Sequence, residues 1–229
     1  MILGIARRLA RLRRLERIGR SDSGLSLVEL LVSSMIGVLL LVTAGSLMIS
    51  AIRTSDVQAD SDVNTRGAST AMNTMSRYLH AATTYPTAAA TLPAFANMSA
   101  TDVTFYAYVN LVSTAAQPVK VRYYVDATTK NLIQQLFPST CSALTGYCTF
   151  ASTPSTVNLG GPVASPTSDG TALFVYLNAG GAPTTDAASV QSVQVNLEYG
   201  SSTAGSPGDT HLTSTVALLN VGQFGGTSS

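Results

Sequence analysis

Few residues in this 229-residue chain combine a reactive type with a spacing that supports catalysis. The two histidines, His80 and His211, are isolated, and no His, Cys and Asp cluster has the spacing of metal ligands. No glycine pair precedes the Lys-Ser or Lys-Thr of a phosphate loop, and no serine lies in a Gly-x-Ser-x-Gly elbow. The loop aspartates Asp169, Asp186 and Asp209 could bind calcium in principle, but isolated acids in polar loops are usually solvated. We therefore expect no enzyme, no cofactor and no metal site.

Glu29 is the carboxylate with the most unusual surroundings. Apart from Glu29, all residues from Gly24 to Ile52 are apolar or small, and no charged residue occurs between Glu29 and Arg53. This uncharged run of 23 residues exceeds the ~20 that an α-helix needs to cross a bilayer. A charge inside a membrane segment is costly and indicates a function. A local role is compatible with this, because Ser26-x-x-Glu29 fits a capping box at the positive end of the helix dipole.

The residues before the apolar stretch predict its orientation in a membrane. Residues 1–24 contain seven arginines against Glu16 and Asp22, a net charge of +5. Because basic residues stay on the cytoplasmic side, the chain after Ile52 should lie outside. A secretory signal peptide also begins with basic residues, but its apolar core is shorter and a small-residue cleavage site follows it. A plain single-span anchor would fit the length but leaves Glu29 unexplained.

The stretch Gly24-Leu25-Ser26-Leu27-Val28-Glu29-Leu30, following a basic leader, resembles the cleavage and methylation motif of type IV prepilins and type II secretion pseudopilins. With leader and helix, the resemblance covers roughly the first third of the chain. Two departures are visible. The residue after the glycine is most often Phe in the family and is Leu25 here. The proline usual midway along the helix of major pilins is absent, and only Gly37 and Gly45 are weak points.

The resemblance implies a role for each residue of the motif. A prepilin peptidase would cut between Gly24 and Leu25 and methylate the new amine of Leu25, which leaves residues 25–229 as the mature chain. Glu29 would neutralise the Leu25 amine of a neighbouring subunit, since an unpaired carboxylate is costly in a low dielectric. The implied partners are other pilin subunits, the peptidase/methylase and an assembly-platform membrane protein. The implied location is a single pass through the inner membrane, then an extracellular filament.

The helix should continue beyond the apolar segment. Residues 53–82 contain no proline, and Pro86 disfavours helix in the residue before it. We expect one helix over 26–82, about 85 Å long, with an apolar half (25–52) and an amphipathic half (53–82). Gly67 should weaken the helix locally, by about 1 kcal/mol of helix stability relative to Ala. The face predicted to be buried consists of Ala68, Met72, Met75 and Leu79.

Residues 83–229 should form a β-rich globular head. The apolar period changes towards 2, which is typical of strands of an antiparallel sheet. Residues 87–101 have little periodicity, so we expect them to form a connection. Residues 151–170 are rich in turn residues. The predicted fold is α+β, a long helix packed on five to seven strands, with the lollipop shape of pilins. The expected strands are 103–111, 118–125, 132–137, 172–178, 190–199 and 212–221, with a hairpin turn at 126–131.

Cys141 and Cys148 are the only cysteines and are separated by six residues. The predicted topology places both on the exported side of the membrane, where disulfides persist. We expect a disulfide that closes a small loop between strands. The alternatives are a reduced pair or a zinc site, which would need His80 and His211 to reach the loop.

Two classes of function fit these features. The first is a structural subunit, a minor pilin or a secretion pseudopilin, and residues 212–221 are similar to the closing strand of minor pilins of the PilW group. The second is a binding module that the filament carries, for adhesion or DNA uptake. Nucleic acid is not indicated, because residues 25–229 contain six Lys and Arg against ten Asp and Glu. The clustered cations Lys120, Arg122 and Lys130 are too few to argue for it.

Overall fold

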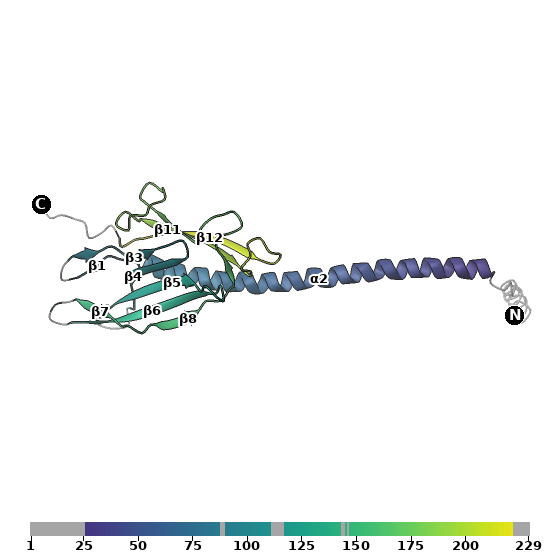
Figure 1. Ribbon diagram of the computed structural model, residues 1–229, viewed down its shortest axis with the longest axis horizontal. Coiled ribbons are helices and arrows are strands. Elements are labelled where there is room, and N and C mark those ends of the chain that lie inside the picture. Colours follow the sequence, from purple (N-terminus) through teal and green to yellow (C-terminus); the bar gives the residue numbers. More distant parts are fainter. Residues whose placement is uncertain (1–25, 88–89, 111–116, 143–144, 146, 222–229) are drawn as a thin grey trace, which may run out of the picture. The chain divides into compact units, whose positions relative to one another are not determined.

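The computed structural model describes residues 26–87, 90–110, 117–142, 145 and 147–221. The chain forms two compact units, Met1–Arg53, described from Ser26 onward, and Thr54–Ser229. The described part contains one long helix near its N-terminal end, followed by antiparallel sheets (Figure 1). The predicted α+β class is therefore confirmed.

Helix α2 (Leu27–His80) is 54 residues long and begins after Ser26. Its first turn closes where the Leu30 N–H donates to the Ser26 carbonyl at 3.1 Å. At its end, the N–H groups of Ala81 and Ala82 donate to carbonyls three residues back, at 3.1 and 3.0 Å. Such tightening is typical of a last helical turn, and it ends the helix two residues before the predicted 82.

The larger sheet has six strands in the order β3-β4-β5-β6-β7, with β8 also paired to β6, and all of its pairings are antiparallel. Strands β4, β5 and β6 confirm three of the predicted strands to within a few residues, and the turn between β5 and β6 falls at 126–131 as expected. The bounds are β3 (Phe95–Met98), β4 (Asp102–Asn110), β5 (Gln117–Val125), β6 (Leu132–Cys141), β7 (Cys148–Phe150) and β8 (Ser155–Asn158).

The second sheet has the order β10-β11-β12, with β9 paired to β11, and β1 pairs with β2 separately. The prediction that 87–101 is only a connection is wrong, because β2 and β3 lie there. Strand β3 buries only its first residue and pairs with β4 across a bulge, so it carries no alternating pattern. The bounds are β1 (Tyr85–Pro86), β2 (Thr91–Leu92), β9 (Val163–Ala164), β10 (Phe174–Leu177), β11 (Ser192–Tyr199) and β12 (Thr210–Ala217).

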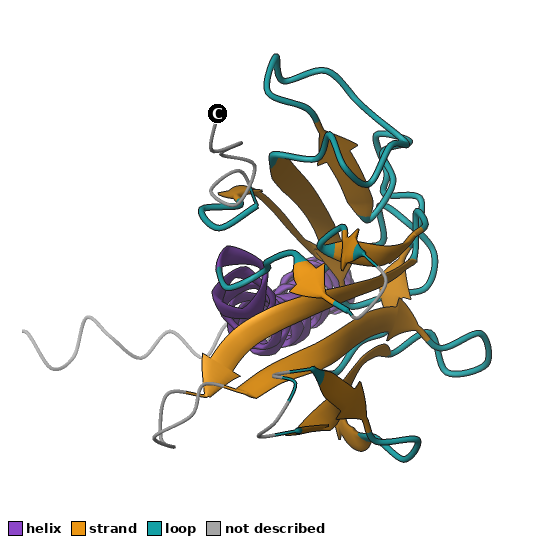
Figure 2. Ribbon diagram, turned by 90° about the vertical axis from the view of Figure 1, so that its left-hand side faces the viewer, coloured by secondary structure: helices purple, strands orange, loops and turns teal. Residues whose placement is uncertain are grey.

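Within the unit Thr54–Ser229, the last turns of α2 lie in the angle between the two larger sheets (Figure 2). The predicted buried face is confirmed, and Ala71 and Tyr78 are buried with it. Tyr78 meets Tyr123 of β5 edge-on, with ring centroids 6.5 Å apart. The sheet side of this core is apolar, and each fully buried side chain of this kind stabilises the fold by about 1.5–3 kcal/mol. The sheet side of the core includes Val103, Phe105, Val121, Val193, Val195, Leu197 and Val216.

Candidate membrane and assembly segment

The described part of the first unit, Ser26–Arg53, belongs to a helix that is long and apolar enough to cross a membrane. The large apolar side chains from Leu27 to Ile52 are all exposed, with fractions between 48% at Val32 and 79% at Leu27. An uninterrupted apolar surface of this size is rare on soluble monomers and marks a membrane or protein contact. Such a surface is suited to contact with lipid or with another apolar helix.

Four hydroxyl groups within this segment donate to carbonyl groups of the helix itself. Ser33 donates to the Glu29 carbonyl at 2.6 Å, and Ser34 donates to the Leu31 carbonyl at 2.9 Å. Thr43 and Ser46 donate in the same way to carbonyls three residues back, at 2.9 and 2.8 Å. Internal hydrogen bonding is what a helix surrounded by hydrocarbon requires, because no water is available there.

Glu29 is the exception to this pattern. Its side chain is exposed in the first turn of α2. Among the residues that the structure describes, its carboxylate has no hydrogen-bond or ion-pair partner, and the reciprocal bonds of a capping box with Ser26 are not formed. Any partner of this charge would therefore come from outside the described residues. Gly24 and Leu25, the predicted cleavage and methylation residues, lie outside them.

The two cysteines form a disulfide, as predicted. Cys141 and Cys148 are directly paired across β6 and β7, with Cα atoms 3.8 Å apart. The alternative of a zinc site is not supported, because the described residues contain no group of three or more suitable ligands. His80 Nδ1 instead donates to the Ala217 carbonyl at 3.0 Å. His211 of β12 lies opposite Glu198 of β11.

Tyr85, which the sequence does not single out, fixes the disulfide-closed hairpin to the sheet. Its hydroxyl accepts from the Cys148 N–H at 2.9 Å and donates to the Cys148 carbonyl. Phe150 stacks on Tyr106 with ring centroids 5.3 Å apart, and its ring centroid is 5.2 Å from that of Tyr85. The disulfide thus holds a small aromatic cluster on the outer face of the larger sheet. No local pattern could have predicted it, because Tyr85 and Cys148 are 63 residues apart.

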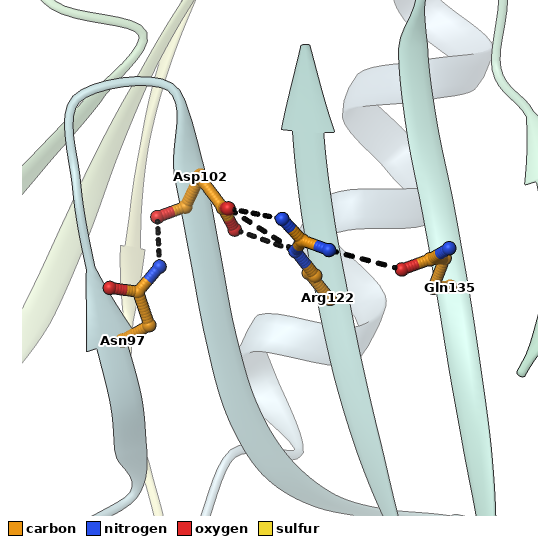
Figure 3. Close-up of polar contacts among 4 residues, drawn as sticks. All are labelled: Asn97, Asp102, Arg122 and Gln135. Atoms are coloured by element: carbon orange, nitrogen blue, oxygen red, sulfur yellow. Dashed lines mark hydrogen bonds and ion pairs between the residues drawn. The ribbon is translucent and has the colours of Figure 1, made fainter. Parts of the chain in front are cut away.

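The cations considered for nucleic acid are already engaged or dispersed. Arg122 binds Asp102 through its Nε, at 3.0 and 3.2 Å, and through Nη2 at 2.6 Å, while Nη1 donates to Gln135 at 3.4 Å (Figure 3). The hydrogen bond to Asp102 raises the pKa of Arg122 against the opposing effect of burial. The Lys120 ammonium lies 4.3 Å from the centroid of the Phe137 ring, and Lys130 lies on the β5–β6 turn. These positions add no support for a nucleic-acid surface.

Glu198 is a buried carboxylate that the sequence does not single out either. It is only 1% exposed, and its carboxylate accepts from the N–H of Ser168 at 2.6 Å and from the N–H of Gly205. Burial raises its pKa, but the hydrogen bonds from Ser168 and Gly205 outweigh burial and hold the pKa below its usual range. A single buried carboxylate therefore joins the loop after β9 to the loop after β11.

The loop aspartates serve the backbone of their own turns. Asp169 accepts from the Thr171 N–H at 3.1 Å and from the Thr167 hydroxyl, and these bonds lower its pKa to about 2. Asp209 accepts from the Ser206 N–H at 2.9 Å, and Asp186 accepts from the Ala188 N–H at 3.1 Å. Partial burial and the nearby Glu198 charge raise the pKa of Asp209. Turn stabilisation accounts for all three.

Comparison of the chain with known protein families gives no match, and comparison with curated protein sequences gives none either.

Proposed function

We propose that this chain is a structural subunit, a minor pilin, of a type IV pilus-like filament. One observation carries the proposal: an apolar helical segment with all its large side chains exposed has in its first turn a single carboxylate, Glu29, that has no partner among the described residues. The sequence before it is a basic leader that ends in Gly24. A secretion pseudopilin is the alternative, since the same features serve both kinds of filament. The lollipop shape of pilins and the position of the head outside the cytoplasm belong to this proposal.

The carboxylate supports assembly rather than simple anchoring. A membrane anchor has no use for Glu29, whose desolvation is costly unless a cation pairs with it. Cleavage between Gly24 and Leu25 would create such a cation, the methylated amine of Leu25. In a filament, the amine of one subunit would lie beside Glu29 of its neighbour. That pairing would set the axial register between subunits, while their apolar helices bury one another's exposed side chains.

The proposed partners are other pilin subunits, the prepilin peptidase/methylase and an assembly-platform protein. The chain would span the inner membrane before assembly and enter an extracellular filament afterwards. A binding role in DNA uptake receives no support, because Asp102 neutralises Arg122 and Lys120 lies against aromatic rings. The head therefore enters the proposal as the part that the filament displays.

Processing tests the proposal. Mass spectrometry of the chain isolated from its native host should show an N-terminus at Leu25 that carries one added methyl group. Gly24→Phe should leave the precursor uncut in the membrane, because a bulky side chain crowds the peptidase site. Ser21→Ala, outside the motif, is the matched control and should be cleaved normally. A mature protein that begins at Met1, or one cut after Ile52, would contradict the proposal.

A further inference from the structure

We propose that a pocket at the junction of the two larger sheets binds a single pyranose sugar residue and prefers an acidic one. The pocket has a volume of about 300 Å³, at the lower end of small-ligand sites. Its polar lining comes from Thr101, Asp126, Lys130, Ser165 and Ser202, and Val125 and Ala127 contribute an aliphatic wall. All of these residues belong to the unit Thr54–Ser229. The inference does not depend on the proposed function, since the pocket would bind a sugar whether or not the chain enters a filament.

The fold builds this pocket from elements that are already fixed. The Val163 N–H of β9 donates to the Lys130 carbonyl at 2.9 Å, which joins the second sheet to the β5–β6 turn. The Val125 N–H donates to the Thr101 carbonyl at 3.1 Å, which fixes the opposite side. The loops that carry Ser165 and Ser202 are joined through Glu198. A ligand would therefore meet a preformed site and would not have to order its walls.

Lys130 is the residue whose presence needs an explanation. It has a φ of 58° and is the only residue other than glycine with a positive φ in the described part of the chain. Glycine or asparagine would close this turn at a lower conformational cost. The Lys130 side chain is exposed, and among the described residues it forms no ion pair. A strained position that keeps an unpaired ammonium group beside a pocket favours a ligand contact.

Asp126 supplies an acceptor on the same side of the pocket. Its Oδ1 accepts from the N–H groups of Thr128 and Thr129, at 3.0 and 2.7 Å, and from the Thr129 hydroxyl at 2.9 Å. These bonds lower the pKa of Asp126, so that it is ionised at neutral pH. Its Oδ2 has no hydrogen-bond partner in the described residues and is available to a ligand hydroxyl.

The combined chemistry selects the ligand class. The hydroxyls of Thr101, Ser165 and Ser202 have no hydrogen-bond partner within the described ranges, so they can both donate and accept. One cation, one carboxylate oxygen, several hydroxyls and an aliphatic wall complement a ring that has adjacent hydroxyls and an apolar face. A small bare anion would use the Lys130 ammonium alone and would be repelled by Asp126. A sugar carboxylate pairs with Lys130 while its ring hydroxyls bind Asp126 and the serines, so we expect preference for a uronic acid.

Saturation-transfer NMR on the full chain in detergent micelles tests this. The probes are methyl glucuronide, methyl glucoside and acetate, each titrated through the millimolar range. We expect methyl glucuronide to bind most tightly, the glucoside more weakly and acetate not detectably. Lys130→Asn removes the ammonium group but tolerates the positive φ, and it should weaken glucuronide binding about tenfold, the effect of losing one charge-assisted contact. Lys120→Gln, the same charge change outside the pocket, should leave it unaltered.

Three results would overturn the inference. One is the absence of saturation transfer to methyl glucuronide in protein whose near-ultraviolet circular dichroism shows a native head. Another is equal affinity of the parent chain and Lys130→Asn for the glucuronide. Acetate binding as tightly as the glucuronide would likewise contradict a sugar site. Each readout is separate from N-terminal processing, so failure here leaves the proposed function untouched.

Discussion

The Tyr199 phenol lies directly against Gly67 of helix α2, so that a Cβ at Gly67 would be 2.8 Å from the phenol oxygen and 2.9 Å from the ring carbon that carries it. On another side, a Cβ at Gly160 would be 1.9 Å from the same oxygen. Tyr199 ends β11 and is 8% exposed. Gly67, which the sequence predicts to weaken the helix, thus leaves the space that the ring of a core tyrosine fills.

We predict that Gly67→Ala destabilises the head, although alanine is the better helix former by about 1 kcal/mol. The added methyl must displace Tyr199, and overpacking of this kind costs about 1–3 kcal/mol. Denaturant unfolding in micelles, followed by the near-ultraviolet signal of the tyrosines, measures the change. Gly37→Ala is the matched control, because a Cβ there has nothing within 4 Å. A more stable Gly67→Ala variant would show that propensity outweighs packing.

A second substitution separates packing from helix propensity. Tyr199→Leu removes the end of the ring, so adding Gly67→Ala to it should cost less than adding Gly67→Ala to the parent chain. Residues in direct contact are expected to be non-additive in this way. Strict additivity of the two changes would contradict the contact as the cause.

Local spacing in the sequence predicts the elements of this fold but not their long-range contacts. The helix, its buried face and the strands β4, β5 and β6 follow from apolar periods of 3.6 and 2, which every buried face must satisfy. The contacts Gly67–Tyr199, Tyr85–Cys148 and Ser168–Glu198 join distant segments, and no local spacing contains them. Short strands such as β3 and β8 are set by pairing with a neighbour and not by their own pattern.

In the candidate segment, the apolar helix could be predicted from the sequence because its signal is local, whereas the roles of Gly24, Leu25 and Glu29 stay predictions. The features of this segment are linear: a charge-free run, one carboxylate at a fixed distance from a glycine, and arginines on one side. The structure adds that the large side chains from Leu27 to Ile52 are exposed together and that Glu29 is without a partner among the described residues. The pocket beside Lys130 had no such linear signal, because its lining comes from four separate segments of the chain, at 101, 125–130, 163–165 and 202.

Reduction of the disulfide should have a local effect. Cys141→Ser combined with Cys148→Ser removes the crosslink, which in the chain-entropy model is worth about 2–3 kcal/mol for so short a loop. We expect faster amide hydrogen exchange over 138–150 and a changed tyrosine signal, because Tyr85 and Phe150 lose their fixed positions. Helix residues 68–79 should keep their protection. Thiol labelling of the unreduced, denatured parent chain checks the starting state, and two free thiols would contradict the bridge.

Glu29 should be needed for assembly and not for insertion. Glu29→Gln keeps a polar side chain but removes the charge, while Glu29→Leu removes both. If the carboxylate pairs with a neighbouring amine, both variants should be cleaved and inserted normally yet enter filaments poorly. Immunoblots of sheared filaments against membrane fractions measure the ratio. Normal incorporation of Glu29→Gln would return the residue to a local role at the start of the helix.

Glu198 should make the stability of the head depend on pH. Its pKa is lower in the folded chain than in the unfolded chain, so its contribution is complete above the unfolded value, near 4.5, and is lost as the pH falls through the folded value. Glu198→Gln removes the charge from the bonds to Ser168 and Gly205, and we expect a loss of about 2 kcal/mol at neutral pH. The difference in unfolding free energy between the parent chain and the variant should shrink as the medium becomes acidic.

Comparing the parent chain with Glu198→Gln separates the effect of Glu198 from that of the other groups that titrate nearby. Asp169 is present in both, so its contribution largely cancels in the difference, whereas part of the Asp209 contribution remains because the Glu198 charge raises the pKa of Asp209. Asp186→Asn is the control for removing an exposed turn carboxylate, and it should change the unfolding free energy little at any pH. If the difference between parent and Glu198→Gln stays constant from neutral pH to well below 4.5, the buried carboxylate does not stabilise the loops through its charge.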